Sequence, residues 1–345
     1  MTMNDRLASV LMQAWMKRGW LAGLLWPIAL LYGVLLTLRC FLYKTGWLQQ
    51  HALPVPVIIV GNIFIGGTGK TPLTLWLLQQ LKSRGYHPGV ISRGYGRTQD
   101  APAVVTLSSL AVDAGDEAVL IAQQSGCPVA VGRNRFDAGT TLLDAFPDVD
   151  VIVADDGLQH LALARNIEIV LFDSRGVGNG WLLPAGPLRE PADRKRDITV
   201  VNLNDAELIS PALPSDTFRM QLEGTSAYPL NGAGQTQSLS SLAPGAKLVA
   251  AAGIGHPERF FSMLRRQGVP FTALPLPDHY RYDVNPFQNL DADLILITEK
   301  DAVKCRQIKQ IADDHRIWVV SVAAHIEGAF MEKIVDRLKI ARLQN

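Results

Sequence analysis

Residues 57–72 have the sequence VIIVGNIFIGGTGKTP, and they predict the fold of the first half of the chain. The apolar, β-branched run at the start of this stretch is typical of a buried strand, and the residues from Pro72 to Leu81 have helical periodicity. Between them lies a glycine-rich turn that ends in Gly-Lys-Thr. A strand, such a turn and a helix in this order predict a phosphate-binding loop. The alternative is an ordinary turn with a chance Gly-Lys-Thr, because Phe64 stands where the full pattern has a glycine.

The residues of this loop have separate expected roles. Three glycines let the backbone curl around an anion, which then meets amide groups and the positive end of the helix. Lys70 is expected to reach the β- and γ-phosphates of a nucleotide, and the hydroxyl of Thr71 is expected to bind Mg²⁺. The predicted nucleotide contacts are Phe64, Ile65, Gly66, Gly67, Thr68, Gly69, Lys70 and Thr71.

A second motif, DVDVIVADDGLQH at residues 148–160, has an apolar run that ends in two acids. A carboxylate at the end of a strand can lie beside the Mg²⁺ that bridges nucleotide phosphates, and a second one can anchor the loop lysine or a metal-bound water. Paired acids at strand ends also cap turns, so the motif alone leaves both readings open. Together with the loop, it predicts a metal site made by Thr71, Asp155 and Asp156.

Several other charged residues follow expected strands. The segments SRGYGR at residues 92–97 and GRNR at residues 132–135 have arginines that either hold an anion or are simply solvated. Asp116 precedes a helical pattern, and its ordinary interpretation is a helix N-cap. His256 and His279 are isolated histidines, which more often have a structural role than a catalytic one.

The chain of 345 residues is long enough for two domains. Apolar runs alternate with helical patterns, which predicts an α/β fold with a P-loop NTPase-like, doubly wound parallel sheet and a second, smaller α/β domain. A stretch rich in Pro, Gly, Ser and Thr, from about residue 210 to 247, is the predicted connection. The predicted division is an N-terminal membrane-anchoring helix at 1–40, a P-loop core at 41–210 and the smaller domain with its linker at 211–345.

The individual elements are predicted from the same patterns. The last helix has apolar residues at Phe330, Ile334, Leu338 and Ala341, which predict a packing face. Beyond the strand and helix around the loop, strands are expected at 89–92, 128–131, 149–154, 167–172, 198–202, 248–252, 294–298 and 317–321, and helices at 117–124, 136–145, 257–267, from 301 and at 327–342.

Composition excludes some classes of partner and site. The formal net charge is +1, which gives no long-range field that would favour nucleic acid. The three cysteines, Cys40, Cys127 and Cys305, are widely spaced, so neither a disulfide framework nor a structural zinc site is expected.

An apolar segment near the N-terminus predicts membrane attachment. Residues 19–38 contain no charged side chain, and a helix of this length just crosses a hydrocarbon core of roughly 30 Å. Aromatic residues and cations lie at both ends, as at membrane interfaces. Pro27 interrupts the middle, so the segment either spans the bilayer or dips into one leaflet. The alternative is a buried core helix.

Taken together, these motifs resemble a known family. The apolar segment is followed in order by VGNIFIGGTGKTP, SRGYG, GDE, DDGLQH, LPAGPLRE, GIGHP and TEKD, and this series is similar to that of the tetraacyldisaccharide 4′-kinase family, over about residues 15 to 325. That family begins its loop at the earlier Gly-Asn, so Phe64 fits its pattern. The resemblance implies ATP- and Mg²⁺-dependent phosphorylation of the 4′-hydroxyl of a tetraacylated glucosamine disaccharide 1-phosphate. It also implies lipid A biosynthesis at the cytoplasmic face of a bacterial inner membrane.

The resemblance also implies roles for particular residues. Asp116 would be the catalytic base, with His279 from the second domain as its partner, and Lys70 would act on the transferred phosphate. Arg189 and Glu190 of the LPAGPLRE motif would close on the nucleotide phosphates.

Two other classes of function remain to be separated from a kinase. A regulatory or metallochaperone GTPase, or a related ATPase, would use a similar loop, but residues 202–205 (NLND) lack the lysine of the usual guanine-reading motif. Preference for ATP over GTP would separate this class. A non-catalytic membrane scaffold is the other class, and phosphate transfer to a lipid acceptor would exclude it.

Overall fold

The computed structural model describes residues 12–204, 207–210, 212–242 and 245–344. Positions 1–11 of the predicted anchoring segment and 211, 243 and 244 of the predicted connection lie outside the described residues. The strands are β1 (Val57–Gly61), β2 (Pro88–Ser92), β3 (Ala103–Val105), β4 (Val129–Val131), β5 (Val151–Asp155), β6 (Ile167–Asp173), β7 (Ile198–Asn202), β8 (Phe218–Pro229), β9 (Gln237–Ser238), β10 (Leu248–Ala252), β11 (Thr272–Pro275), β12 (Leu294–Thr298) and β13 (Ile317–Ile326).

The helices other than α4 and α9 lie near the positions that the sequence predicts. The helices are α2 (Trp20–Lys44), α3 (Lys70–Ser83), α4 (Ala111–Ala114), α5 (Asp116–Ser125), α6 (Arg135–Ala145), α7 (Pro257–Arg266), α8 (Glu299–Cys305), α9 (Lys309–Ala312) and α10 (Gly328–Gln344), with a 3₁₀ turn η1 (Leu239–Ser241). The short elements β3, α4, β9 and α9 were not predicted, because two to four residues are too few to show a period.

All described strands belong to one sheet, with the order β11-β10-β12-β13-β8-β7-β6-β1-β5-β2-β4-β3 and β9 beside β8. Most neighbours are parallel, but β13 with β8, β3 with β4 and β8 with β9 are antiparallel. The α/β class is therefore confirmed, and the predicted parallel sheet is found as a mostly parallel, mixed sheet.

Strand β1 lies between β5 and β6 in the middle of the first half, and all five of its residues are buried. Its parallel register with β5 places Val60 beside Asp155. The loop after β1 and the acids that end β5 therefore emerge at the same edge of the sheet. This is the carboxyl edge, where ligands bind in α/β folds.

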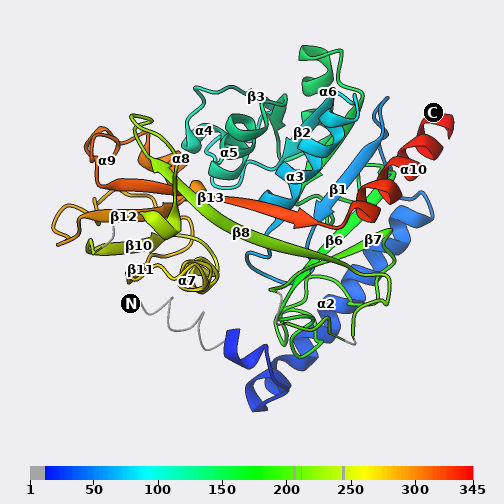
Figure 1. Ribbon diagram of the computed structural model, residues 1–345. Helices are drawn as coiled ribbons and strands as arrows, with labels where there is room; N and C mark the ends of the chain where they lie inside the picture. Colours follow the sequence, from blue (N-terminus) through cyan, green and yellow to red (C-terminus); the bar gives the residue numbers. More distant parts are fainter. Residues whose placement is uncertain (1–11, 205–206, 211, 243–244, 345) are drawn as a thin grey trace.

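The two long strands β8 and β13 connect the two halves of the molecule (Figure 1). They pair antiparallel over residues 220–229 and 318–326, with a register shift between Ser321 and Ala323. Strand β8 lies within the stretch predicted as a connection, so that stretch is not only a linker. Strand β8 was not predicted because it lies in a segment rich in turn-forming residues. Its buried and exposed residues also alternate only in part.

The packing face predicted for the last helix is confirmed, because Phe330, Ile334, Leu338 and Ala341 are all buried. This face packs against the first half of the chain, where the ring of Phe330 lies 5.5 Å from that of Trp76 on α3. The division at residue 210 stays a prediction, but α10 belongs by its contacts to the core of the earlier segment.

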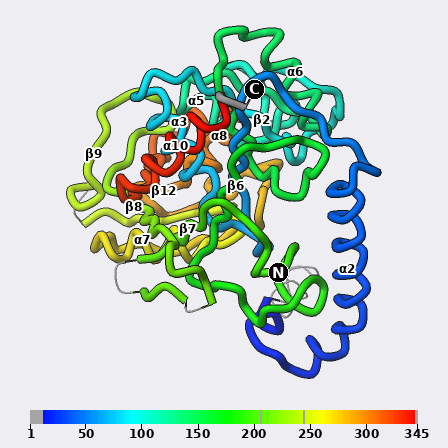
Figure 2. Tube along the Cα trace, turned by 90° about the vertical axis from the view of Figure 1, so that its right-hand side faces the viewer, coloured from blue at the N-terminus to red at the C-terminus, as the bar shows by residue number. Residues whose placement is uncertain are grey.

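Helix α2 lies along one side of the molecule, away from most of the body (Figure 2). It has 25 residues, a mean hydropathy of 2.1 in its most apolar window and only 11% of that window buried. By length and composition it can cross a membrane, and its low burial argues against a core helix. It contacts the loop before Arg189, where Trp26 lies 6.2 Å from Trp181.

Candidate active site

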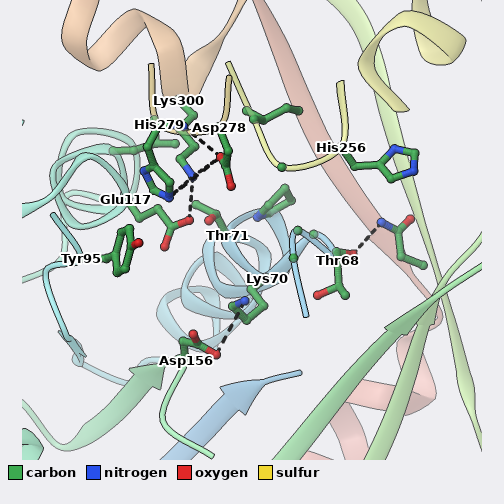
Figure 3. A pocket seen from close by; sticks show the side chains of 18 of the residues that line it. Thr68, Lys70, Thr71, Tyr95, Glu117, Asp156, His256, Asp278, His279 and Lys300 are labelled. Atoms are coloured by element: carbon green, nitrogen blue, oxygen red, sulfur yellow. Dashed lines mark hydrogen bonds and ion pairs between the residues drawn. The ribbon is translucent and has the colours of Figure 1, made fainter. Parts of the chain in front are cut away.

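A cavity of about 1440 Å³ lies at the carboxyl edge of the sheet, between the two halves. Its walls include the predicted phosphate-binding loop, both Arg-rich segments, the start of α5 and the residues around β12 and α8. Figure 3 shows side chains from both halves pointing into it.

The loop after β1 has the curled backbone that the sequence predicts. Gly66 and Gly69 have φ angles of +95° and +101°, which L side chains rarely adopt. At Gly69 a Cβ would also lie 2.8 Å from the side-chain nitrogen of Asn202. That asparagine donates to the carbonyl oxygen of Thr68 at 3.0 Å, so β7 supports the loop from below.

Asn62 fixes the shape of the loop from inside. Its buried amide nitrogen donates to the carbonyl oxygens of Phe64 at 2.6 Å and Gly66 at 3.0 Å. Its amide oxygen accepts from Nζ of Lys70 at 3.1 Å. The sequence marked Gly61-Asn62 as an early start of the turn but indicated no role for this side chain.

Asp156 lies where it can hold the loop lysine, as expected. Its Oδ1 is 3.6 Å from Nζ of Lys70, and its Oδ2 is 3.3 Å from Nη1 of Arg189. Burial would raise the pKa of Asp156, but the charges of Lys70 and Arg189 lower it below its ordinary value. The carboxylate therefore stays ionised and positions both cations beside the loop.

Asp155 is buried and, unlike Asp156, its carboxylate makes no ion pair with the loop lysine or with Arg189. Its Oδ1 accepts from the hydroxyl of Thr74 at 3.4 Å, whereas its buried Oδ2 meets no hydrogen-bond partner among the described residues. Burial, with the carboxylate of Glu117 nearby, raises the pKa of Asp155 to about 7. A buried carboxylate oxygen without a partner, next to the phosphate-binding loop, is a suitable ligand for a cation.

Asp116 contacts His279, which lines the cavity, although 163 positions separate them in the chain. Asp116 is the first residue of α5, and its Oδ2 lies 3.0 Å from Nδ1 of His279, which follows β11. The N-cap of α5 is Gly115, so the N-cap interpretation of Asp116 is wrong. His279 has a φ angle of +54°, and its ring lies 4.9 Å from that of Tyr95.

Asp116 is 4% exposed, and two lysines of α8 face it. Burial would raise the pKa of its carboxyl group, but the hydrogen bond from His279 and the charges of Lys300 and Lys304 together hold it well below its usual range. Nζ of Lys304 lies 3.4 Å from Oδ2. Asp116 is therefore a carboxylate throughout the neutral range.

Two predicted nucleotide contacts do not line the cavity. The side chain of Phe64 is 1% exposed in the core, with the guanidinium of Arg175 4.2 Å from its ring centre. Glu190 accepts from Nε2 of Gln159 at 2.6 Å and pairs with Arg194 at 2.8 Å, so its carboxylate is already occupied. The other predicted contacts, Ile65, Gly66, Gly67, Thr68, Gly69, Lys70, Thr71 and Arg189, all line the cavity.

The Arg-rich segments reach the cavity in part. Arg93, Arg133 and Arg135 line it. Arg135 is 4% exposed and donates to the carbonyl oxygen of Gly132 at 3.0 Å, so it is a built-in cation rather than a solvated one. His256 lies at the N-cap position of α7 and also lines the cavity.

A cluster that the sequence did not predict lies beside the loop. Asp173, at the end of β6, pairs with Arg175 at 2.6 Å and with Arg259 of α7 at 2.8 Å. Both arginines also donate to the carbonyl oxygen of Gly67, at 3.1 and 3.4 Å. The strand expected at 167–172 ended one residue before Asp173. An acid directly after an apolar strand was the signal in the sequence that could have indicated this cluster.

Comparison with known proteins agrees with this geometry. The model of the family described as LpxK, tetraacyldisaccharide-1-P 4′-kinase, matches residues 21–339. The chain belongs to this family. Its activity is that of a tetraacyldisaccharide 4′-kinase, a phosphotransferase of lipid A biosynthesis.

Individual relatives cover nearly the whole chain. The tetraacyldisaccharide 4′-kinase of Janthinobacterium sp. (strain Marseille) is 54% identical and that of Herminiimonas arsenicoxydans is 52% identical, over 97% and 95% of this chain and 97% and 94% of theirs. A crystal structure described as the "apo" form of LpxK from Aquifex aeolicus in complex with ATP is 28% identical, with a TM-score of 0.77. That match covers 92% of this chain and 99% of the other.

Proposed function

We propose that the chain transfers the γ-phosphate of ATP to the 4′-hydroxyl of a tetraacylated glucosamine disaccharide 1-phosphate, with Asp116 as the catalytic base. The observation that carries this proposal is the contact, at 3.0 Å, between Asp116 and His279, which lines the same cavity as the phosphate-binding loop. A nucleotide site with an ionised carboxylate beside its cavity suits phosphate transfer to a hydroxyl.

The loop binds the nucleotide in this proposal. Gly66, Gly67 and Gly69 allow the backbone to approach the phosphates, and Lys70 meets their charge. Arg189, which Asp156 orients, adds a second cation on the same side. The relative from Aquifex aeolicus, described in complex with ATP, supports ATP as the donor.

The residues present also fit Mg²⁺. Mg²⁺ usually binds through one or two protein oxygens together with substrate phosphates. In agreement, the described residues contain no group of three or more His, Cys, Asp or Glu side chains that could hold a metal ion without the nucleotide. The unpaired Oδ2 of Asp155 and the hydroxyl of Thr71 would hold the ion, with Asp156 nearby. When bound, Mg²⁺ neutralises charge on the phosphates.

Asp116 accepts the proton of the acceptor hydroxyl as the new bond to phosphorus forms. Its carboxyl group is ionised at neutral pH, because its pKa lies well below the usual range. A low pKa makes it a modest base, so much of its contribution is to orient the hydroxyl towards the phosphate. Nδ1 of His279 donates to Oδ2 of Asp116 and thereby restricts the rotation of the carboxylate.

The acylated acceptor enters from a membrane. Helix α2 exposes Leu24, Leu31 and Leu35, with 68%, 61% and 56% of each side chain accessible, so its apolar side suits a bilayer. Because an ATP site requires the cytoplasm, we place the protein at the cytoplasmic face of a bacterial inner membrane. The near-neutral net charge supports no role for nucleic acid.

The decisive experiment incubates the purified protein with [γ-³²P]ATP, Mg²⁺ and the tetraacylated disaccharide, and follows label in the glycolipid. Asp116→Ala should lower kcat by at least about 10² with little change in the KM for ATP. His279→Ala should do the same less severely, and the double variant should be no worse than Asp116→Ala. Asp113→Ala, which removes an exposed acid three residues earlier, is the matched control. A lowered melting temperature with kcat within a few-fold of wild type would contradict the base.

A further inference from the structure

Lys300 joins the groups that surround the Asp116–His279 pair. It lies in the first turn of α8, and its Nζ donates to Oε1 of Glu117 at 3.0 Å. The same Nζ lies 3.4 Å from Nε2 of His279 and 4.0 Å from Oδ1 of Asp278 (Figure 3). Its side chain is only 17% exposed, so these contacts hold the ammonium in place.

The start of α8 is itself firmly anchored. The side chain of Thr298 caps the helix by accepting from the backbone nitrogen of Asp301 at 3.1 Å. The buried carboxylate of Asp301 in turn accepts from the backbone nitrogen of Gly253 at 3.0 Å. Both contacts fix the backbone on either side of Lys300, so the Cα atom of Lys300 has a defined position.

The two ring nitrogens of His279 face groups of opposite charge. Nδ1 faces a carboxylate, which when ionised only accepts hydrogen bonds, so this contact favours a proton on Nδ1. Nε2 faces an ammonium group, which only donates, so Nε2 must present its lone pair. One neutral tautomer, with the proton on Nδ1, satisfies both contacts, and the Nε2–H tautomer satisfies neither.

The other charged or aromatic groups around the ring do not reverse this preference. Asp278 is 4.0 Å from Nε2, beyond hydrogen-bond distance, and its Oδ1 already accepts from the backbone nitrogen of His279 at 3.0 Å. Lys304 faces Asp116 at 3.4 Å. The ring of Tyr95 is tilted by 44° against the ring of His279, with the two centroids 4.9 Å apart. Glu117 is paired with Lys300.

We propose that Lys300 is a positioning residue for the phosphate transfer, because it holds His279 as the Nδ1–H tautomer and so makes it a donor to Asp116. This inference rests on the proposed role of Asp116. Lys300 also pairs α5 with the 278–279 loop, which belong to opposite walls of the cavity. The tautomer is therefore set only when the two walls are together.

The test reads the tautomer directly, without turnover. Protein with ¹⁵N-labelled histidine, in detergent micelles at pH 8, is examined by two-bond ¹H–¹⁵N correlation of the imidazole rings, which distinguishes the two tautomers. The chain has seven histidines, and His279→Asn assigns the relevant signals. We expect His279 of the wild-type protein to be the Nδ1–H tautomer. The Nε2–H tautomer, or a mixture of the two, would overturn the proposal.

Two variants distinguish the effect of Lys300 on the tautomer from that of the neighbouring cation, Lys304. Lys300→Met should shift part of the His279 population to the Nε2–H tautomer, since the contact with Asp116 alone then favours the proton on Nδ1. Lys304→Met removes a charge that faces Asp116 and not the ring, so it should leave the tautomer unchanged. Unchanged His279 signals in Lys300→Met would contradict the proposal. If that variant does not fold, the wild-type spectrum still tests the tautomer, and Lys300→Arg, which also only donates, should keep it; loss of the tautomer in Lys300→Arg would contradict the proposal.

Kinetics supply the second readout. Lys300→Met should lower kcat by about tenfold or more, with the KM for ATP within about twofold, as expected when a residue that orients a functional histidine is lost. Lys300→Arg, which also only donates, should retain more activity. The double variant with His279→Ala should be no slower than His279→Ala alone. Full activity of Asp116→Ala would refute the proposed base, whereas the tautomer is read in the wild-type protein and in the lysine variants, so the two failures are distinguishable.

Discussion

The hydroxyl of Tyr32 donates a hydrogen bond to the backbone carbonyl oxygen of Arg189 at 2.9 Å. Tyr32 lies on the apolar helix α2, whereas Arg189 lines the cavity and pairs with Asp156. A single contact therefore connects the segment that we place in the membrane with a cation that we place beside the nucleotide.

Tyr32→Phe should raise the KM for ATP a few-fold, because the backbone that carries Arg189 loses one anchor worth about 1 kcal/mol. Initial rates at varied ATP concentration measure this effect. Tyr43→Phe is the control, since that ring lies on the same helix beside Arg39, 5.9 Å from its guanidinium. Equal KM values for both variants and the wild type would show that the contact has no part in nucleotide binding.

Lys70→Ala should abolish nearly all transfer, by about 10³ or more in kcat, while the protein stays folded, because the lysine stabilises charge on the transferred group. Radiolabel transfer and a thermal melt measure the two properties. Lys82→Ala, at the exposed end of the same helix, should change neither property strongly. Turnover close to wild type in Lys70→Ala would refute the kinase mechanism.

Leu31→Glu combined with Leu35→Glu should release the protein from membranes, because each charge costs about 2 to 3 kcal/mol in a bilayer core. Both side chains are more than half exposed, so the fold should persist. Flotation with phospholipid vesicles measures attachment. Leu208→Glu, at a position that is 89% exposed on the body of the protein, is the control. Unchanged flotation of the double variant would place the attachment elsewhere.

His160 should make the protein less stable in mild acid. Burial, with Arg135 and Arg165 nearby, lowers the pKa of His160 from 6.5 to about 4. The unfolded chain therefore binds a proton at this position between those values, and the folded chain does not, so the free energy of unfolding falls as pH decreases through this window.

His160→Gln should have a flatter dependence of the free energy of unfolding on pH between about 6.5 and 4. Urea unfolding at several pH values measures the slope, and His87→Gln, at an exposed position, is the control. A slope as steep as that of the wild type in His160→Gln would show that other groups cause the acid sensitivity.

Local patterns were sufficient for the elements nearest the site. The β-branched run, the glycines and the helical periodicity after Lys70 each act within a few residues, so β1, the loop and α3 could be predicted from the sequence. The same holds for the apolar helix α2 and for the packing face of α10. The acids at the end of β5 were predicted beside the loop because parallel neighbours end at one edge, and the register of Val60 with Asp155 agrees.

Only the tertiary structure decided which distant residues meet. No local pattern distinguishes His279 from a structural histidine, since its role depends on Asp116, Lys300 and Tyr95, which other segments supply. The buried places of Phe64 and Glu190 depend likewise on Arg175, Gln159 and Arg194. Side-chain burial and ion pairing are properties of the packed chain, because both depend on what the fold brings within a few ångströms.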